Sequence, residues 1–385
     1  MERRTWAEVD LDAIAHNMKE IRKITNPSAQ IMAVVKADAY GHGFLEVTRT
    51  LLDNGADRLA VAVLQEGKQL RSRGVDVPIL VLGALMEEDI EDYINFNITP
   101  NVFTYDQAKA ISYIAEKKEI VTKIHIKIDT GMSRIGFVAT EDNSAIVDEI
   151  AKIAKLPYIE IEGIFSHFAT SDENDRSYTL LQFKRFMDVV NKLEKKNVII
   201  PIKHICNSAG IMMYPEMHLD MVRPGVILYG MYPSDEVDKS RLNLKPAMTL
   251  KSRITFVKEV EAGRGVSYGK EYITKEPTKI ATVPIGYADG YLRKLSKKGK
   301  MMVHGQLVPI IGRICMDQCM IDVTNVNNIE RGDEVIIFSD SGITIDDVAK
   351  WLDTINYEVA CVIGKRIPRI YTKHGKEVKV LNYLL

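Results

Sequence analysis

The strongest constraint on the fold is the alternation of short apolar segments with helical segments through the first two thirds of the chain. The predicted strands cover residues 32–35, 59–63, 79–82, 98–103, 124–129, 159–167, 202–207 and 220–223. Helical periodicity is clearest in residues 44–54, 87–95, 106–118, 144–155 and 176–196. Eight strands that are each followed by a connection favour a closed (β/α)8 barrel over an open sheet.

The pattern changes after about residue 245, where long stretches of alternating apolar and polar residues appear without matching helices. These stretches cover residues 249–257, 278–284, 300–311 and 333–338. Such alternation is typical of antiparallel strands with one exposed face. We therefore predict an α/β chain with a (β/α)8 barrel in residues 1–240 and a β-rich domain in residues 241–385. The two should join near a cluster of Pro, Ser, Asp and Lys in residues 232–244.

The charge balance and the cysteine content exclude several classes of protein. The chain has 385 residues with 51 basic and 52 acidic side chains, so its net charge of −1 gives no broad field for nucleic acid or for an acidic membrane surface. No segment approaches the ~18 uninterrupted apolar residues of a membrane span, and we expect a cytoplasmic protein with small-molecule partners. The 4 cysteines are expected to be free thiols. Cys315 and Cys319 lack a second ligand pair at zinc spacing, so no metal site is expected.

Lys36 stands at the end of the first predicted strand, just before a loop that contains Gly41 and Gly43. Ligands of a (β/α)8 barrel gather at the carboxyl ends of its strands. Burial there pushes a lysine toward the neutral amine, which attacks a carbonyl and forms a Schiff base. A strand-end lysine whose ammonium group simply reaches water is the alternative.

Other polar residues follow the carboxyl ends of the predicted strands and should converge with Lys36 on one site. They are Tyr40, Lys127, Asp129, Arg134, His167, Asn207, Ser208, Arg223 and Gly225. The segments at 208–210 and 223–226 would offer backbone N–H groups and a hydroxyl to a phosphate.

A Schiff-base lysine beside a phosphate cradle suggests pyridoxal phosphate as the cofactor. Neither a G-x-G-x-x-G segment between a strand and a helix nor a G-x-x-x-x-G-K-[ST] segment occurs, so the usual signals of nucleotide binding are missing. Taken singly, His167 is also explained as a hydrogen-bonded core histidine, and Arg134 or Arg223 as a surface cation.

Several longer motifs carry a resemblance to a known family. They are AVVKADAYGHG at residues 33–43, DTGM at 129–132, RPG at 223–225, GVSYG at 265–269, GYADG at 286–290 and GRICMDQ at 312–318. Through these motifs, nearly the whole chain resembles the bacterial alanine racemases. The resemblance implies a pyridoxal-phosphate enzyme with an amino-terminal (β/α)8 barrel and a carboxyl-terminal β domain. Such an enzyme interconverts L- and D-alanine and supplies D-alanine for peptidoglycan.

The resemblance assigns two catalytic groups, Lys36 and Tyr268. Lys36 would hold the cofactor and act as the base on one face of the substrate, while Tyr268 would serve the opposite face. A racemase needs an acid and a base on opposite sides of Cα, because one group removes the proton and the other returns it inverted. Tyrosine titrates at about 10 when unperturbed, so such a tyrosine needs assistance at neutral pH.

His167 and Arg223 match the two residues that give this assistance. In the family the histidine supports the tyrosine and is linked to the arginine, which also hydrogen-bonds the pyridine nitrogen of the cofactor. A guanidinium does not readily give up a proton, so the nitrogen should stay unprotonated and the ring should be a weaker electron sink than with a carboxylate partner. We expect fewer side reactions of the carbanion as a result.

The remaining matches concern binding. The implied cofactor-binding residues are Lys36, Tyr40, Arg134, His167, Asn207, Ser208, Arg223, Gly225, Val226 and Tyr357, and the implied substrate-binding residues are Arg134, Met316 and Tyr287. Lys127 matches a lysine that is carbamylated in some members and then positions Arg134. Tyr287, with Arg293 nearby, matches a residue at the entrance. One departure is Ser133, where the family has glycine, which accepts a positive φ more easily.

The resemblance also implies an assembly. Lys36 and Tyr268 fall in different predicted domains, and in the family the tyrosine comes from the partner subunit, as does the methionine that matches Met316. We therefore expect a two-fold, head-to-tail homodimer with two shared sites.

Three other functions explain part of the sequence. A related barrel decarboxylase for basic amino acids has an acidic residue at the pyridine nitrogen, and Arg223 argues against it. A non-catalytic pyridoxal-phosphate carrier resembles a barrel without a β domain, and residues 245–385 argue against it. A Schiff-base aldolase explains neither Tyr268 nor the second domain. Serine or a broader range of substrates stays open, as does the choice between a biosynthetic and a catabolic role.

Overall fold

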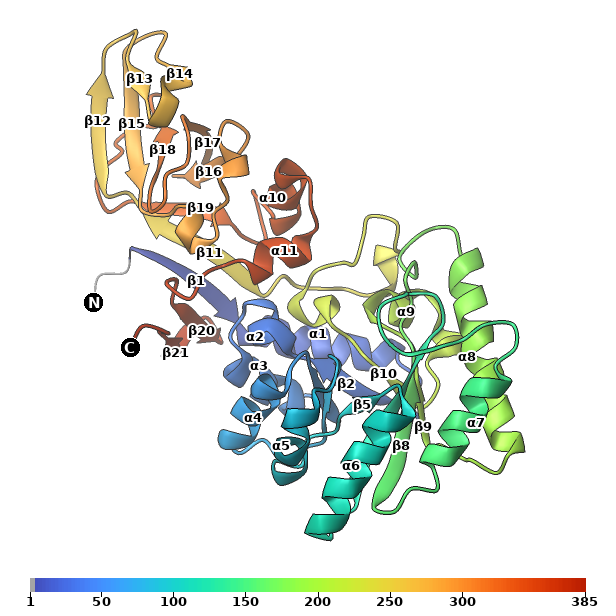
Figure 1. Ribbon diagram of the computed structural model, residues 1–385. Coiled ribbons are helices and arrows are strands. Elements are labelled where there is room, and N and C mark those ends of the chain that lie inside the picture. The colour runs from blue at the N-terminus through green and yellow to red at the C-terminus, as the bar shows by residue number, and fades with distance from the viewer. Residues whose placement is uncertain (1–3) are drawn as a thin grey trace. The chain divides into compact units, whose positions relative to one another are not determined.

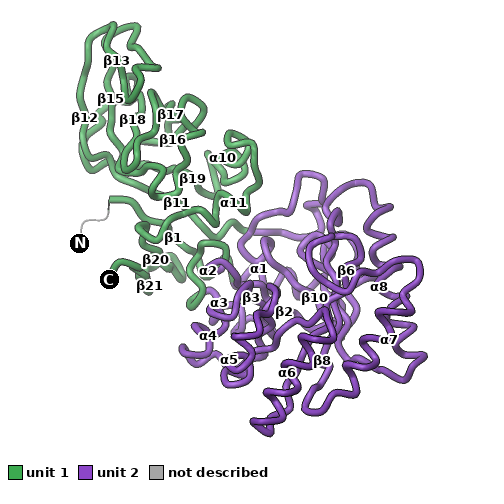
Figure 2. Tube along the Cα trace, in the orientation of Figure 1, with its two compact units in different colours: residues 1–14, 40–46, 245–385 green, residues 15–39, 47–244 purple. Residues whose placement is uncertain are grey.

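The structure is a computed structural model that describes residues 4–385, and these residues divide into two compact units. The barrel unit comprises residues 15–39 and 47–244, and the β unit comprises residues 4–14, 40–46 and 245–385. Figure 2 draws the barrel unit in purple and the β unit in green.

Eight parallel strands form the ring of the barrel unit, at the places predicted from the sequence (Figure 1), and the short β7 (Phe137–Val138) pairs with β6 outside this order. They are β2 (Gln30–Val34), β3 (Arg58–Val61), β4 (Ile79–Val81), β5 (Asn101–Val102), β6 (Thr122–Asp129), β8 (Ile159–Phe165), β9 (Ile202–His204) and β10 (Met221–Val222). β10 closes the ring by pairing with β2. A parallel bridge between Leu80 and Thr99 joins β4 to the segment before β5. The Arg223 N–H donates to the carbonyl of Cys206 (3.0 Å) just beyond β9 and β10. The expected (β/α)8 barrel is thus confirmed.

Helices connect the barrel strands and lie outside them (Figure 1). They are α4 (Leu64–Ser72), the 3-10 helix η1 (Glu87–Asp89) with α5 (Ile90–Asn95), α6 (Tyr105–Lys118), α7 (Ser144–Ile153), α8 (Ser177–Lys195) and the short α9 (Ser208–Met213). Two more helices, α1 (Leu11–Ile24) and α3 (Phe44–Asp53), begin in the β unit and end in the barrel unit. α6 begins where Thr104 Oγ1 accepts the N–H of Gln107 (3.2 Å) and ends at Glu119, whose φ is 54°.

The barrel interior is unusually polar along β6. Ile124 and Ile126 are fully buried and alternate with the buried side chains of His125 and Lys127. Successive side chains of a strand point to opposite faces, so the isoleucines face the helices and the polar residues face the interior. There His125 contacts His204 of β9. Branched apolar side chains usually fill this space in such barrels.

The β unit is built on a ten-stranded sheet. In spatial order its strands are β12 (Phe256–Val260), β15 (Thr278–Val283), β18 (Cys319–Asp322), β17 (Gln306–Ile311), β16 (Lys300–Val303), β19 (Glu334–Phe338), β11 (Met248–Arg253), β1 (Thr5–Asp10), β20 (Arg369–Lys373) and β21 (Lys376–Leu381). β1 precedes the barrel in the sequence, yet it pairs with β11 and with β20. A separate two-stranded hairpin is formed by β13 (Gly265–Val266) and β14 (Tyr272–Ile273).

The β-rich architecture is as predicted, but three details differ. The stretch at 249–257 forms two strands, β11 and β12, because the ladder breaks between them. The stretch at 300–311 is a hairpin of β16 and β17, whose turn residues His304 and Gly305 have φ of 48° and 76°, as a tight hairpin turn requires. Two helices that were not predicted follow β19, namely α10 (Ile345–Leu352) and α11 (Asn356–Cys361).

Three further expectations concern membranes, thiols and metals. Within residues 4–385, no helix combines the length and the apolar character that crossing a bilayer needs. Cys206, Cys315 and Cys319 are free thiols, as expected. No group of three or more His, Cys, Asp or Glu side chains in the described part of the chain is arranged to hold a metal ion.

Candidate active site

The residues that follow β2 form a left-handed turn that begins at Lys36 (labelled α2, Lys36–Tyr40, in Figure 1). Residues 37–40 have φ of 52°, 55°, 54° and 53°. A left-handed backbone costs roughly 1 kcal/mol or more for each residue that has a Cβ. The Ala37 N–H donates to Glu66 Oε1 (2.6 Å) and helps to hold the turn. Strain of this kind persists only where the surrounding structure enforces it, and it gathers at functional sites.

Arg223 follows β10 and is buried in a set of four hydrogen bonds. It donates through Nη1 to His204 Nδ1 (2.8 Å) and through Nη2 to His167 Nδ1 (3.3 Å). Nη2 also donates to the carbonyls of Ser166 (2.7 Å) and Ile205 (3.1 Å). Burial lowers the pKa of Arg223 to about 10, which leaves the guanidinium charged at neutral pH.

The contact with Arg223 fixes the protonation of His167. A guanidinium only donates hydrogen bonds, so His167 Nδ1 must accept. Burial, followed by the charges of Arg223 and Lys127, holds the pKa of His167 well below its ordinary value, and the ring is neutral at pH 7. The single ring proton therefore lies on Nε2, and His167 presents one N–H donor.

Basic side chains gather around His167. Lys127 is buried, with Nζ 4.4 Å from the centroid of the Phe165 ring. Burial, together with Arg223 and Arg134, holds the pKa of Lys127 well below its ordinary value. Among the described residues, neither Lys127 nor Arg223 takes part in an ion pair with a carboxylate. The field of this cluster favours an anionic ligand.

The loop after β6 carries Arg134. The Asp129 carboxylate accepts the N–H groups of Gly131 (2.9 Å) and Ser133 (3.0 Å) and so closes the turn. Ser133 has a φ of 57°, the left-handed region that glycine adopts more easily. The turn forms in spite of this serine, and Arg134 follows it with an exposed side chain.

The predicted cofactor-binding residues that follow β9 and β10 are brought together by hydrogen bonds. Asn207 Oδ1 accepts the N–H of Gly210 (2.9 Å) and starts α9. Ser208 Oγ accepts the N–H of Gly225 (2.9 Å), which joins the chain after β9 to the chain after β10. Gly225 and Val226 are buried beside Ser208.

Tyr40 and Tyr357, the other predicted phosphate ligands, lie in the β unit with their ring centroids 6.0 Å apart. Burial, and secondarily Tyr357, raise the pKa of Tyr40, so its hydroxyl keeps its proton and can donate. Arg369, which was not predicted, donates to the carbonyl of Gly41 (2.9 Å), directly after Tyr40. No local signal in the sequence distinguishes this arginine.

Tyr268, Tyr287 and Met316 lie on adjoining loops of the β unit. The N–H of the residue after Tyr287 donates to the Met316 carbonyl (3.0 Å). Ser267, which precedes Tyr268, donates through Oγ to the carbonyl of Arg313 (2.6 Å). The side chains of Tyr268, Tyr287 and Met316 are 69%, 41% and 52% exposed in the single chain.

Three buried polar residues near Arg223 were not predicted. His204 accepts from Arg223, and its Nε2 lies 2.9 Å from His125 Nδ1. His125 Nε2 in turn lies 3.2 Å from Glu162 Oε2. The sequence holds a signal for the last two, since polar residues alternate with isoleucines in β6 and β8. The alternation does not reveal which of these side chains meet inside the barrel.

Comparison with protein families gives two matches along the chain. The alanine racemase N-terminal domain matches residues 9–233. The alanine racemase C-terminal domain matches residues 247–371. Together these two domains account for most of the chain.

Curated relatives are similar over nearly their whole length. Alanine racemase 1 of Clostridium acetobutylicum is 51% identical over 385 residues, which cover 99% of both chains. The alanine racemase of Clostridium tetani is 51% identical over 386 residues, again 99% of both chains.

Solved structures show the same likeness. The alanine racemase of Clostridium difficile 630 superposes with a TM-score of 0.96 at 46% identity and covers 99% of each chain. The alanine racemase of Bacillus anthracis with bound L-Ala-P superposes with a TM-score of 0.93 at 37% identity, covering 100% of this chain and 99% of the other. The chain therefore belongs to the alanine racemase family, the enzymes that interconvert L- and D-alanine.

Proposed function

We propose that the chain interconverts the alanine enantiomers with pyridoxal phosphate as its cofactor, and that Lys36 and Tyr268 are its two acid/base groups. This proposal is supported mainly by the environment of Arg223. This charged guanidinium is buried between two neutral imidazoles, those of His167 and His204. In such an arrangement the guanidinium can donate a further hydrogen bond to a neutral acceptor, such as the pyridine nitrogen of the cofactor.

The donor set fits the cofactor. The proposed phosphate ligands are Tyr40, Ser208, Gly225, Val226 and Tyr357. Asn207 is a further proposed cofactor-binding residue, and Lys36 is the point of covalent attachment. The guanidinium groups of Arg223 and Arg134 both act on His167 and supply the positive charge that an anionic ligand requires. When bound, pyridoxal phosphate supplies an electron sink for the charge that develops at Cα as its proton leaves.

Two groups move protons at Cα. Lys36 takes the proton from one face of the bound amino acid, and Tyr268 gives a proton to the opposite face; the reverse reaction exchanges these roles. His167 assists Tyr268, because its Nε2–H donates a hydrogen bond to the phenolate oxygen that remains. A neutral imidazole is a weak acid, so His167 stabilises this oxygen without protonating the substrate itself.

Arg223 limits how strongly the cofactor ring can withdraw electrons from Cα. With a pKa of about 10 the guanidinium keeps its proton, and the ring nitrogen receives none. The charge at Cα is then less delocalised, which favours rapid reprotonation over side reactions. The alternative of a barrel decarboxylase, with an acidic residue at this nitrogen, is disfavoured for the same reason.

The loops at the strand ends and in the β unit bind the substrate. Arg134 binds the substrate carboxylate, and Lys127, once carbamylated, positions Arg134. Met316 lines the pocket and Tyr287 its entrance. The exposure of these two side chains and of Tyr268 in the single chain supports a head-to-tail homodimer in which they complete the partner's site. The D-alanine formed supplies peptidoglycan synthesis, and a cytoplasmic location stays a prediction.

Hydrogen exchange tests the two-base mechanism. The enzyme with pyridoxal phosphate is incubated with L-alanine in deuterated water, and the first D-alanine formed is analysed for deuterium at Cα. Separate acid and base groups predict deuterium in nearly all of this product, because the proton taken by Lys36 is not the one returned. Product that keeps the original proton would require a single group and would refute the proposal.

Variants assign the two groups. Tyr268→Phe should lose at least ~10²-fold in rate and keep the cofactor, because only an acid/base hydroxyl is removed. Tyr113→Phe, at an exposed tyrosine of α6, should keep the wild-type rate. In Lys36→Ala, borohydride should no longer fix the cofactor to the chain. A panel of enantiopure amino acids then defines the substrate range.

A further inference from the structure

A continuous line of buried polar side chains runs through the barrel interior to Arg223. It begins at Glu162 in β8 and passes through His125 in β6 and His204 in β9. Glu162, His125, His204 and Arg223 are 5%, 1%, 0% and 3% exposed. The line therefore crosses the barrel out of contact with water.

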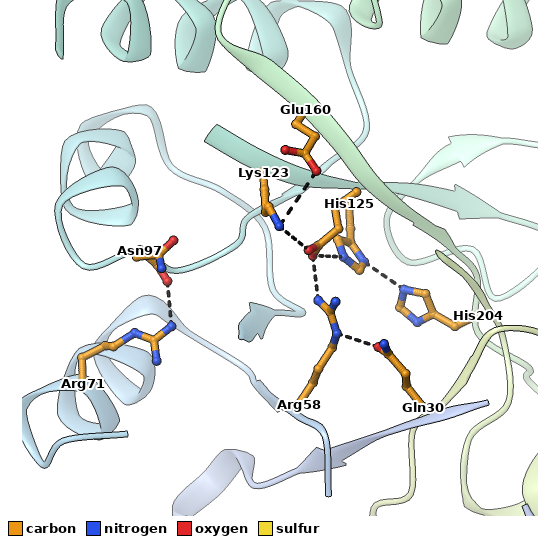
Figure 3. Close-up of polar contacts among 9 residues, drawn as sticks. Gln30, Arg58, Arg71, Asn97, Lys123, His125, Glu160 and His204 are labelled. Carbon is orange, nitrogen blue, oxygen red and sulfur yellow. Dashed lines mark hydrogen bonds and ion pairs between the residues drawn. The ribbon is translucent and has the colours of Figure 1, made fainter. Parts of the chain in front are cut away.

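The carboxylate of Glu162 anchors the line near the amino-terminal ends of the strands. Figure 3 shows Arg58, Lys123 and His125 turned toward one carboxylate, with His204 beyond His125. Arg58 Nη1 donates to Glu162 Oε2 (2.8 Å), and Lys123 Nζ donates to Glu162 Oε1 (3.0 Å). Burial alone would raise the pKa of Glu162, but hydrogen bonds from His125, Arg58 and Lys123 hold it well below its ordinary value. The line thus ends in a negative charge.

The hydrogen bonds of the line have one direction. Arg223 Nη1 can only donate, so His204 Nδ1 accepts (2.8 Å). Burial, followed by the charge of Arg223, holds the pKa of His204 well below its ordinary value, and the neutral ring carries its proton on Nε2. That N–H donates to His125 Nδ1 (2.9 Å). Burial also lowers the pKa of His125, whose Nε2–H donates to Glu162 Oε2 (3.2 Å).

The surrounding strands are shaped to hold the two imidazoles. A Cβ on Gly163 of β8 would lie 2.4 Å from His125 Cε1, so only glycine leaves room for that ring. The register of β6 with β8 shifts between Ile124 and His125, opposite this glycine. Phe165 stacks on His204 with 4.8 Å between the ring centroids and 7° between the planes. Close packing of this kind prevents either ring from turning over freely.

The charge of Glu162 supports the same direction from the opposite end of the line. While it is ionised, His125 must direct its N–H toward it, and His204 must then present an acceptor to Arg223. Without that charge both imidazoles can shift their protons, and His204 can present an N–H to Arg223. Two donors would then face each other, and the guanidinium would have to move.

We propose that Glu162, His125 and His204 form a positioning relay for Arg223. The relay sets the direction in which the guanidinium donates, and it offsets part of the guanidinium charge where Arg223 meets the ring nitrogen of the cofactor. The relay rests on the proposed function, because Arg223 is a cofactor ligand only if that function is correct. A merely structural interior would need no common direction of its hydrogen bonds.

Nitrogen NMR of the holoenzyme tests the direction without any substitution in the relay. With ¹⁵N-labelled histidine, the ring nitrogens of His125 and His204 are assigned through their contacts with neighbouring protons. We expect both rings to be neutral with the proton on Nε2. A proton on Nδ1 of either ring, or a doubly protonated ring, would overturn the proposal.

The variant Glu162→Gln tests the effect on Arg223, and Glu160→Gln is its matched control. Glu160 lies on the same strand and also approaches Lys123 (3.9 Å), but its side chain is half exposed. In Glu162→Gln we expect the dissociation constant for pyridoxal phosphate to rise ~10-fold and the absorption band of the bound cofactor to shift. In Glu160→Gln both should stay within about twofold of wild type.

The outcomes separate the relay from the proposed function. A wild-type protein that does not racemise alanine with pyridoxal phosphate refutes the proposed function, whatever the state of the histidines. A wild-type enzyme that racemises alanine, with a folded Glu162→Gln variant that binds and absorbs like Glu160→Gln, refutes the relay alone. If Glu162→Gln does not fold, the NMR of the wild-type enzyme decides.

Discussion

Arg369 Nε lies 2.9 Å from the carbonyl oxygen of Gly41, so a residue near the end of the chain holds the turn that follows Tyr40. The same buried guanidinium donates to the carbonyls of Gly364 (2.8 Å), Ile367 (2.6 Å) and Ile363 (2.7 Å). These last three residues follow α11, which carries Tyr357. One side chain thus fixes the backbone beside both tyrosines that we propose as phosphate ligands.

Replacement of Arg369 by methionine should destabilise the β unit strongly. Four carbonyls, three of them in buried contacts, would lose their donor, which we expect to cost at least ~3 kcal/mol in the free energy of unfolding. Urea unfolding followed by fluorescence measures this loss. Arg331→Met, at an exposed arginine of the same unit, should change stability by no more than ~0.5 kcal/mol. Equal effects of the two variants would show that the buried contacts do not stabilise the unit.

The change Ser133→Gly should stabilise the loop that carries Arg134. Ser133 has a φ of 57°, and glycine removes the contact of Cβ with the backbone in this conformation. The gain should be about 0.5–1 kcal/mol, since glycine also gives the unfolded chain more freedom. Ser72→Gly, at an exposed serine in α4, should instead destabilise by about 0.5 kcal/mol. A loss of stability in Ser133→Gly would contradict the argument from backbone strain.

The barrel was predictable because its signal is local. Each strand is a short apolar run, and five of the connecting segments have clear helical periodicity, so most of the order of elements follows from the sequence alone. The pairing of β1 with β11 and β20 was not predictable in this way, because strands far apart in the chain leave no local trace of their partners. α10 is a different case: Thr344 and Asp347 form a capping box before an apolar helical face, a signal that was present and overlooked.

The sequence predicted those parts of the site in which the type of residue by itself indicates the chemistry. A lysine, a histidine and an arginine at the carboxyl ends of the strands predict a shared ligand site at that end of the barrel. The relay behind them was not predicted, because a histidine such as His204 in an apolar strand is usually a satisfied core residue. Only the geometry shows that Arg223 is its donor and that Glu162 lies at the other end.

The buried histidines predict a loss of stability in acid. The pKa values of His125, His167 and His204 are all below the ordinary value of about 6.5 that the unfolded chain has. Below about pH 6.5 the unfolded chain therefore binds protons that the folded chain excludes, and the free energy of unfolding falls as the pH falls. Each histidine contributes up to about 1.4 kcal/mol per pH unit. This contribution is fully present above that pH.

Urea unfolding between pH 8 and pH 5.5, a range of about 2.5 units around the unfolded pKa, measures the slope. His125→Gln should be less dependent on pH than the wild type, because one excluded proton is removed. A wild-type free energy of unfolding that is constant over this range would contradict the prediction.

Lys127 should react with carbon dioxide. Burial and the neighbouring arginines hold its pKa well below the ordinary value, and a neutral amine is the form that becomes a carbamate. Carbon NMR with ¹³C-labelled bicarbonate should show a carbamate carbon in the wild type and in Lys109→Met, a surface variant of α6, but not in Lys127→Met. Acidification should remove the signal, because a protonated carbamate loses carbon dioxide. A signal that survives in Lys127→Met would place the modification on another lysine.

Mixed dimers test whether the sites are shared between subunits. Lys36 lies in the barrel unit and Tyr268 in the β unit, and we propose that each site takes one of them from each subunit. Lys36→Ala and Tyr268→Ala should each be inactive alone. When they are co-expressed with different tags, a mixed dimer carries both lesions in one site and none in the other. Random pairing makes about half of the dimers mixed, so activity near a quarter of the wild type is expected. Purified mixed dimers without activity would mean that each site is built within one chain, and the head-to-tail arrangement would have to be given up.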